Sequence, residues 1–224
     1  MRKTGTMKST FYQRYGKRLF DLLIVVPGLL AISPLLFGLA ILVRITLGSP
    51  VFFKQPRPGL NEKIFTALKF RTMTDEKGTD GKLLPDAKRI TNLGAFMRRT
   101  SLDELPQLFN VLIGNMSLVG PRPLLTEYLD YYTERERYRH TVMPGITGLA
   151  QISGRNNVPW NERLELDVRY AENQSFRLDI QILLKTFIKV FKRTDIQVDT
   201  SGEGSLKTLR EKYTMKINDS GDSK

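Results

Sequence analysis

The sequence predicts a mainly helical α+β fold that carries a membrane element, on three observations. Residues 22–43 contain no charged side chain, two short runs of β-prone residues flank a turn-rich segment, and later segments repeat apolar residues at helical spacing. We therefore expect a re-entrant membrane helical hairpin, a small β-hairpin, and amphipathic helices that lie at the membrane interface.

The length of 224 residues suits one domain with its membrane element. We divide the chain into a basic amphipathic lead-in (1–18), the re-entrant membrane helix (19–47), a main domain with interfacial helices (48–193) and a polar, partly disordered tail (194–224). Of the net charge of +12, residues 1–73 carry +10. Because these basic residues surround the apolar segment, anionic lipid headgroups explain them better than nucleic acid does.

A Ser-Pro pair, Ser33-Pro34, lies near the midpoint of the apolar segment. Proline leaves the carbonyl of Leu30 without its helical donor, and in lipid this is costly unless a hydroxyl such as that of Ser33 satisfies it. Both flanks are basic, whereas a spanning helix concentrates Lys and Arg on one side. We therefore favour a segment that turns back at mid-depth over a kinked spanning helix, and both over a cleaved signal peptide.

The segments after the apolar run alternate between strand, loop and helix patterns. Residues 51–53 and 64–70 are strand-like, and residues 55–61 between them have the Pro and Gly content of a loop. Residues 75–86 predict a polar loop and residues 90–99 a helix. The two strand-like runs are expected to pair as a hairpin.

The rest of the chain, from residue 101, predicts four further helical or loop segments. Ser101 and Glu104 form a capping-box pattern at the start of a helix that Gly114 ends. A helix is expected over 124–137 and a loop with short extended pieces over 144–157. Residues 179–193 predict a basic amphipathic helix suited to the membrane interface, with a packed surface helix as the alternative.

The adjacent carboxylates Asp103 and Glu104 are the first candidates for chemistry. Acids in the first helical turn are often caps, which gain about 0.3–1 kcal/mol each from the helix dipole. The same dipole lowers the pKa of a carboxyl group and keeps it anionic, as a nucleophile or a metal ligand requires. The spacing alone favours capping.

Clusters of basic residues beside glycine and proline strengthen the functional interpretation. They are Lys69-Phe-Arg71, Arg98-Arg99, Gly120-Pro-Arg-Pro123 and Gly154-Arg-Asn156. An arginine between two prolines has a nearly fixed backbone, which suits bidentate phosphate binding. With a carboxylate nucleophile and a membrane hairpin, these clusters describe a site for a diphosphate at the bilayer surface.

Taken in order, these motifs resemble those of one known family, the bacterial monotopic phosphoglycosyl transferases of the small single-domain type. The similarity runs from about Arg14 to Arg193. The matching motifs are Lys17-Arg-Leu-Phe-Asp21, Ser33-Pro34, Phe53-Lys-Gln-Pro-Arg-Pro-Gly59, Lys69-Phe-Arg-Thr-Met73, Leu102-Asp-Glu-Leu-Pro-Gln-Leu-Phe-Asn110, Val119-Gly-Pro-Arg-Pro123 and Pro144-Gly-Ile-Thr-Gly-Leu-Ala-Gln151.

The resemblance implies transfer of a sugar-1-phosphate from a UDP-sugar to undecaprenyl phosphate, giving undecaprenyl-diphosphate-sugar and UMP, the first membrane step of glycoconjugate or exopolysaccharide biosynthesis. It implies that Asp103 attacks the β-phosphorus and forms a covalent aspartyl-phosphosugar intermediate, that Mg²⁺ is required and lies near Asp103, and that Glu104 is essential as base, orienter or ligand. By position it implies phosphate, nucleotide or other substrate contacts from a further set: Lys69, Arg98, Arg122, Arg155, Asp167 and Asp179.

The resemblance also implies a monotopic protein on the cytoplasmic face of the bacterial inner membrane, with both termini cytoplasmic and downstream glycosyltransferases as possible partners. The alternative is a non-catalytic, membrane-anchored scaffold in which the acidic pair only caps a helix. No residue selects the sugar, so donors of the UDP-N,N′-diacetylbacillosamine type, UDP-GalNAc, UDP-Gal and UDP-Glc all stay open, as does the oligomeric state.

Overall fold

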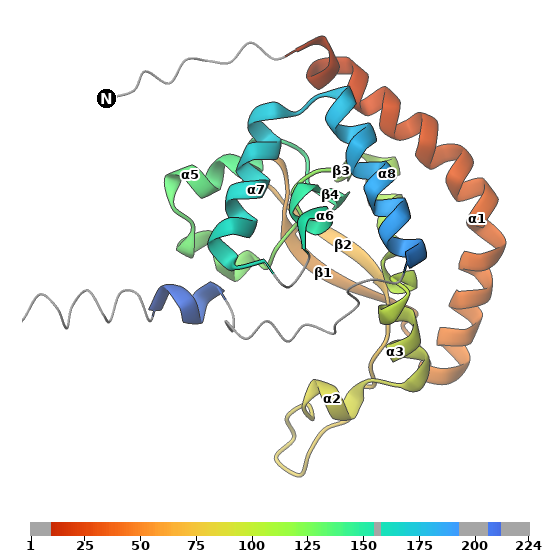
Figure 1. The fold of residues 1–224 in the computed structure, drawn as a ribbon. Helices are drawn as coiled ribbons and strands as arrows, with labels where there is room; N and C mark the ends of the chain where they lie inside the picture. The colour runs from red at the N-terminus through yellow and green to blue at the C-terminus, as the bar shows by residue number, and fades with distance from the viewer. Residues whose placement is uncertain (1–9, 155–157, 193–205, 212–224) are drawn as a thin grey trace, which may run out of the picture.

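The computed structural model describes residues 10–154, 158–192 and 206–211 (Figure 1). Within these residues the protein is mainly helical, with two small two-stranded sheets. The helices are α1 (Lys17–Leu47), α2 (Asp86–Arg89), α3 (Asn92–Arg99), α4 (Gln107–Ile113), α5 (Glu134–Arg137), α6 (Leu149–Ser153), α7 (Trp160–Asn173) and α8 (Phe176–Lys192). The strands are β1 (Phe52–Pro58), β2 (Ile64–Phe70), β3 (Ser117–Val119) and β4 (Gly145–Thr147). Short turns are η1 (Tyr12–Gly16), which is π-helical, and the 3₁₀ helices η2 (Leu60–Glu62), η3 (Leu102–Glu104), η4 (Thr126–Tyr131) and η5 (Tyr138–Thr141).

The long helix α1 curves around one side of the molecule (Figure 1). With η1 it forms the one helix in the described residues that is long and apolar enough to cross a membrane. The helix continues without a break through Pro27 and Pro34, and the Ser33 hydroxyl donates to the Leu30 carbonyl at 2.8 Å. This bond confirms how the freed carbonyl is satisfied. The helix α1 is continuous and curved, and it is not divided into the two antiparallel halves of a helical hairpin. Its path relative to a membrane stays a prediction.

Apolar side chains are exposed on several elements. They include Leu30, Phe37 and Ile45 on α1, Phe52 and Phe53 on β1, Phe109 and Ile113 on α4, and Leu184, Phe187 and Ile188 on α8. Soluble monomers rarely expose contiguous apolar patches larger than a few hundred Å². An apolar α1 with apolar neighbours on β1, α4 and α8 indicates that the protein associates with a membrane.

A buried polar network fastens α1 to the rest of the domain. The Lys17 Nζ donates to the Asp179 carboxylate of α8 at 2.6 Å, and the Tyr170 hydroxyl of α7 donates to the same carboxylate at 2.7 Å. Asp179 is fully buried. Asp21, one turn after Lys17, accepts the Leu118 N–H of β3. The membrane helix is therefore held at its N-terminal end by α7, α8 and β3.

The hairpin was predicted correctly at β2 and too short at β1. The strands pair in antiparallel register from Phe52 opposite Phe70 to Pro58 opposite Ile64. The prediction of a loop from residue 55 was wrong for residues 55–58, which continue β1. A two-stranded ribbon has only edge strands, and an edge strand tolerates the missing N–H of proline.

The capping-box prediction at Ser101 was wrong. Ser101 has a left-handed backbone (φ 57°), its side chain accepts no cap bond, and the acidic pair lies in η3, ahead of α4. Gly114 does end α4 in the left-handed conformation (φ 91°), as predicted. The turn between Ser101 and Gln107 therefore presents the two carboxylates outside a regular helix.

Two further segments differ from prediction because side chains redirect the backbone. The helix expected over 124–137 is divided into η4 and α5, since Thr133 makes a capping box with Glu136 and begins a new helix. The loop expected over 144–157 contains β4 and α6, and β4 pairs in parallel with β3. The helix α7 was not predicted, whereas α8 agrees with the amphipathic helix expected near the C-terminus.

The residues at 206–211 form a short helix that lies on the domain. Leu206 is fully buried in a cluster with Tyr128, Trp160 and Leu164. The polar tail predicted over 194–224 therefore contains at least one packed segment, and its other residues lie outside the described part of the chain.

Candidate active site

The acidic pair lies among three of the basic residues that the sequence singled out, Lys69, Arg98 and Arg122. Asp103 is 7% exposed, and none of the described residues donates a hydrogen bond to its carboxylate. Glu104, its neighbour in η3, has 17% of its side chain exposed and is bound by two cations. The two carboxylates thus have opposite environments. Asp103 has no hydrogen-bond donor among the described residues, whereas Glu104 is bound by Lys69 and Arg122.

Glu104 joins the hairpin to the loop that follows β3. The Lys69 Nζ of β2 donates to its Oε1 at 2.7 Å, and the Arg122 guanidinium donates to both carboxylate oxygens, with Nη1 3.1 Å from Oε2. Burial alone would raise the pKa of Glu104, but the Arg122 and Lys69 charges outweigh it and hold that pKa well below its usual range. Glu104 is therefore a permanent anion that positions two cations.

Asp103 has the reverse electrostatics. Burial, and then the negative charge of Glu104, raise its pKa from 3.8 to about 6, against the opposing effect of Lys69, Arg98 and Arg122. The expectation that a helix dipole lowers this pKa was wrong, because Asp103 does not lie at the start of a regular helix. A carboxylate that is desolvated, without a hydrogen-bond partner and anionic at neutral pH has the properties of a nucleophile.

Lys69 is held in place by an amide on α4. The Asn110 side chain accepts the Leu68 N–H at 3.0 Å and donates to the Thr66 carbonyl at 2.8 Å, so it pairs with the free edge of β2. Asn110 is almost fully buried. Because α4 directly follows η3, this clamp sets the position of Lys69 relative to Glu104.

Arg122 is positioned by close backbone contacts. Gly120, Gly145 and Gly148 pack so tightly that a Cβ atom added at Gly145 would lie 2.1 Å from the Gly120 nitrogen. The Arg122 carbonyl accepts the guanidinium of buried Arg139 at 2.6 Å. Two rigid loops and one arginine therefore fix the backbone from which Arg122 reaches Glu104.

The other predicted site residues divide into three groups. Arg98 is part of the cluster: its charge acts on Asp103, and its Nε donates to Thr72 at 3.0 Å. Asp167 is buried and binds Arg139, so it reaches the cluster only through the Arg122 backbone. Asp179 belongs to the network that fastens α1, fully buried with its donors in place. The structure brings neither aspartate to the acidic pair, and Arg155 lies outside the described residues.

Arg57 is a member of the cluster that the sequence interpretation missed. The charges of Arg122 and Glu104 both act on its guanidinium, and burial first and Arg122 second lower its pKa to about 10. Its motif Pro56-Arg-Pro58 repeats the pattern that singled out Arg122. That repetition was the available signal. Asn110 and Arg139 had no such signal, because their roles depend on contacts distant in sequence.

The donor set near Asp103 fits one divalent cation that also binds substrate. Mg²⁺ in phosphoryl-transfer sites commonly takes one or two carboxylates and completes its shell with phosphate oxygens and water. Within the described residues there is no group of three or more His, Cys, Asp or Glu that could hold a metal. Asp103 offers the one carboxylate here without a polar partner, since Glu104 is bound by Lys69 and Arg122.

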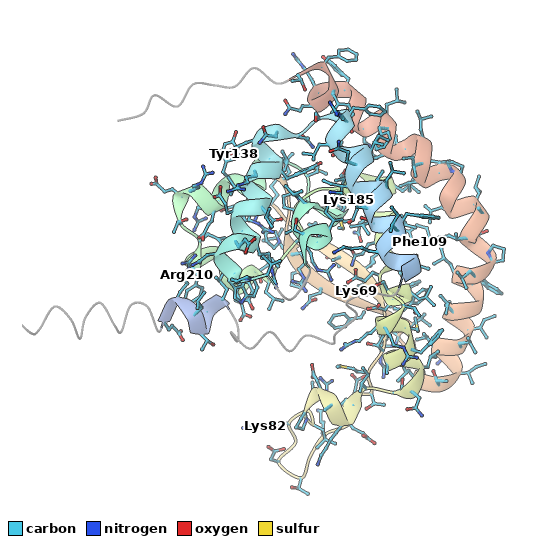
Figure 2. All side chains as sticks on the ribbon, viewed as in Figure 1. Lys69, Lys82, Phe109, Tyr138, Lys185 and Arg210 are labelled. Carbon is cyan, nitrogen blue, oxygen red and sulfur yellow. The ribbon has the colours of Figure 1, made fainter. Side chains whose placement is uncertain are left out.

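An apolar groove of about 490 Å³ lies between α1, the hairpin and α4. Its lining includes Phe37 of α1, Phe52 and Phe70 of the hairpin, and Pro106 and Phe109 beside α4. Phe109 lines this groove together with Leu29 and Phe37 of α1, and it is labelled with Lys69 in Figure 2. The groove thus shares its walls with the segments that carry Glu104 and Lys69.

Comparison with known proteins finds similarity over most of the chain. The profile of the family described as "Bacterial sugar transferase" matches residues 12–193. The "Uncharacterized sugar transferase EpsL" of Bacillus subtilis (strain 168) is 55% identical over 181 residues, 81% of this chain and 90% of that protein. The "UDP-glucose:undecaprenyl-phosphate glucose-1-phosphate transferase" of Xanthomonas campestris pv. campestris is 38% identical over 85% of this chain and 41% of its own length. The "Undecaprenyl-phosphate galactose phosphotransferase" of Salmonella typhimurium is 40% identical over 80% of this chain and 41% of its own length.

Proposed function

Because this chain belongs to the bacterial sugar transferase family, we propose that it transfers a sugar-1-phosphate from a UDP-sugar to undecaprenyl phosphate and releases UMP. The similarity to enzymes named for this reaction supports the reaction class. The observation that carries the chemistry is the contrast within the acidic pair: Asp103 is buried without a hydrogen-bond partner among the described residues, whereas Glu104 is held by Lys69 and Arg122.

In the proposed first step an oxygen of the Asp103 carboxylate attacks the β-phosphorus of the donor. The bond from that phosphorus to the bridging oxygen breaks, its electron pair stays on the α-phosphate, and UMP leaves. The product is an acyl phosphate between Asp103 and the sugar phosphate. The absence of competing hydrogen bonds favours attack, because a carboxylate that is not tied up by donors retains its nucleophilicity.

In the second step a phosphate oxygen of undecaprenyl phosphate attacks the same phosphorus. The bond to Asp103 breaks and regenerates its carboxylate, and the diphosphate product remains in the membrane. Lys69 and Arg122 offset the phosphate charges that would otherwise repel an anionic nucleophile. A Mg²⁺ ion bound by Asp103 and phosphate oxygens would supply further charge neutralisation.

The apolar surface supports a lipid acceptor. The groove between α1, the hairpin and α4 contains Phe52, Phe70 and Phe109, and its volume lies within the roughly 300–1,000 Å³ usual for ligand pockets. We assign this groove to the first isoprene units of the acceptor, because its walls continue into the segments that hold Lys69 and Glu104. The protein is proposed to work on the cytoplasmic face of the inner membrane, where UDP-sugars are available.

The test is UMP release by detergent-solubilised protein with Mg²⁺ and undecaprenyl phosphate, screened over UDP-glucose, UDP-galactose, UDP-GalNAc and UDP-N,N′-diacetylbacillosamine. A donor labelled in its β-phosphate should label the protein when the acceptor is omitted, and Asp103→Asn should lose both the label and UMP release. Asp80→Asn, in an exposed loop, is the matched control and should retain both. Label retained in Asp103→Asn would refute the nucleophile, and a folded protein inactive with every donor would favour a scaffold.

A further inference from the structure

Arg57 is a cation of the site to which neither the resemblance nor the similarity to other enzymes gives a role. Its strand β1 pairs with β2 so that Phe53 lies opposite Lys69 and Arg57 opposite Phe65. Side chains two residues apart share a face of a strand, so Arg57, Gln55 and Lys69 lie on the same face of the hairpin. Glu104 binds Lys69 on this face.

The Arg57 side chain folds back along that face toward the acidic pair. Four residues of extended chain separate Arg57 from the Phe53–Lys69 rung, roughly 13 Å. Its Nη2 donates to the Gln55 Oε1 at 2.6 Å, so the guanidinium turns toward Lys69 rather than away from it. The charges of Glu104 and Arg122 act on it, which places it beside the cluster.

Arg57, like Arg98, has no carboxylate partner among the described residues, in contrast to Lys69 and Arg122. Its hydrogen-bond acceptor is the neutral Gln55 amide, whereas Lys69 and Arg122 bind Glu104. Among the residues that the structure describes, this cluster has four cationic side chains (Arg57, Lys69, Arg98 and Arg122) and two carboxylates (Asp103 and Glu104), a formal charge of +2. Such an excess in a half-buried site suits an anionic substrate.

The position of Arg57 along the hairpin separates the two phosphate substrates. The Phe52–Phe70 end of the hairpin lines the apolar groove beside α1. The Arg57 end extends toward η4, whose Tyr128 acts on the Arg57 charge, and toward the side of α5 and α7 in Figure 1. An acceptor phosphate attached to a lipid would approach from the groove end, so the far end is left for the soluble donor.

We propose that Arg57 binds the α-phosphate of the nucleoside diphosphate sugar and stabilises it as it leaves on UMP. When the Asp103 oxygen bonds to the β-phosphorus, the bond to the bridging oxygen breaks and that oxygen gains negative charge on the α-phosphate. A guanidinium already in place there stabilises the charge as it develops. Its Pro-Arg-Pro backbone and the Gln55 contact hold it ready. This assignment rests on the proposed function and goes further by giving the leaving group its own cation.

The experiment compares wild type, Arg57→Gln, Arg57→Lys and Lys54→Gln as full-length protein in detergent. Lys54 is the matched control, because it is an exposed cation on the same strand and the opposite face. Two rates are measured with the donor that the wild type uses: the UMP burst without acceptor, and discharge of the preformed labelled intermediate onto undecaprenyl phosphate. UMP binding is measured separately by calorimetry.

Arg57→Gln should slow the UMP burst roughly 100-fold and weaken UMP binding roughly 10- to 100-fold. Discharge of the intermediate should change less than about twofold, because the α-phosphate has left by then. Arg57→Lys should recover part of the burst, and Lys54→Gln should match the wild type. Gln55→Ala should reduce the UMP burst rate and the UMP affinity less than Arg57→Gln does, since it removes only the hydrogen bond that orients the guanidinium.

Three outcomes would overturn the assignment. A slow discharge with a normal burst would place Arg57 at the acceptor instead. If Arg57→Gln, Lys54→Gln and the wild type had the same UMP burst rate and UMP affinity, Arg57 would not bind the substrate. The proposed function would be unaffected by this outcome. A wild type that neither releases nor binds UMP would refute the proposed function and this assignment together.

Discussion

At the scale of single residues, the acidic pair separates two tasks that adjacent carboxylates would otherwise share. Glu104 accepts hydrogen bonds from two cations and stays anionic, while Asp103 lacks such donors among the described residues and titrates near pH 6. The two carboxylates follow the left-handed Ser101 in η3, and of the two only Glu104 accepts hydrogen bonds from Lys69 and Arg122. Environment therefore assigns the roles, as it does wherever neighbouring carboxyl groups have different pKa values.

The raised pKa of Asp103 predicts a dependence of stability on pH. The folded protein keeps a proton on Asp103 between about pH 4 and 6 that the unfolded chain has released, so stability falls as pH rises through this window. We expect Asp103→Asn to match the wild type near pH 4 and to be more stable by roughly 1–3 kcal/mol above pH 6. Urea unfolding in detergent without divalent cations measures this, with Asp80→Asn as control. If Asp103→Asn were already more stable than the wild type by the full ~1–3 kcal/mol at about pH 4, the prediction would be contradicted.

At the scale of elements, the site is assembled from short segments that stabilise each other. Asn110 of α4 pairs with the edge of β2, and Arg139 of η5 holds the loop that carries Arg122. The glycines of the two loops after β3 and around β4 allow the backbones to approach. None of these elements is long enough to be stable alone, so cation positions depend on contacts between elements.

The variant Asn110→Leu should show how far the hairpin depends on the two hydrogen bonds that the Asn110 side chain makes with β2. Leucine keeps most of the volume but leaves the Thr66 carbonyl and the Leu68 N–H without their partner, at about 1–3 kcal/mol for each buried group. We expect a loss of roughly 2–5 kcal/mol in urea unfolding and a slower UMP burst, because Lys69 shifts relative to Glu104. Asn173→Ala, at an exposed helical site, should stay within about 0.5 kcal/mol. Equal stability of the two variants would contradict this role for Asn110.

At the scale of the whole molecule, α1 connects a buried polar network at one end to the apolar groove beside the site. Its N-terminal end is fastened to α7, α8 and β3 through Lys17, Asp21 and Asp179, and its later turns line the apolar groove. Removing one partner of a buried ion pair such as Lys17–Asp179 typically costs 3–5 kcal/mol. The helix α1 is thus packed into the domain's core through its N-terminal half rather than attached as a separate anchor.

The path of α1 predicts where its two ends lie. If the bend near Ser33 and Pro34 returns the chain to the same face, cysteines introduced singly among residues 2–10 and at Lys54 should both react with a reagent confined to the cytoplasm. The chain has no cysteine of its own, so each label reports one site. Replacing Ser33 and Pro34 by alanine should favour a straight spanning helix and protect residues 2–10. Both sites reactive in this double variant would show that another feature bends the helix.

The apolar segment with its Ser-Pro pair, the strand β2, the amphipathic helix α8 and the acidic pair could all be predicted from the sequence, because each depends on composition or on neighbours within a few residues. The tertiary structure decided which cations bind which carboxylate, why the pKa of Asp103 is raised to about 6, and that Asp167 and Asp179 belong to buried networks with Arg139 and Lys17. It also decided the surroundings of Arg57, whose Pro-Arg-Pro motif matches that of Arg122 in the sequence but whose guanidinium binds the Gln55 amide instead of a carboxylate. Burial and pairing between distant segments control these properties, and no local pattern encodes them.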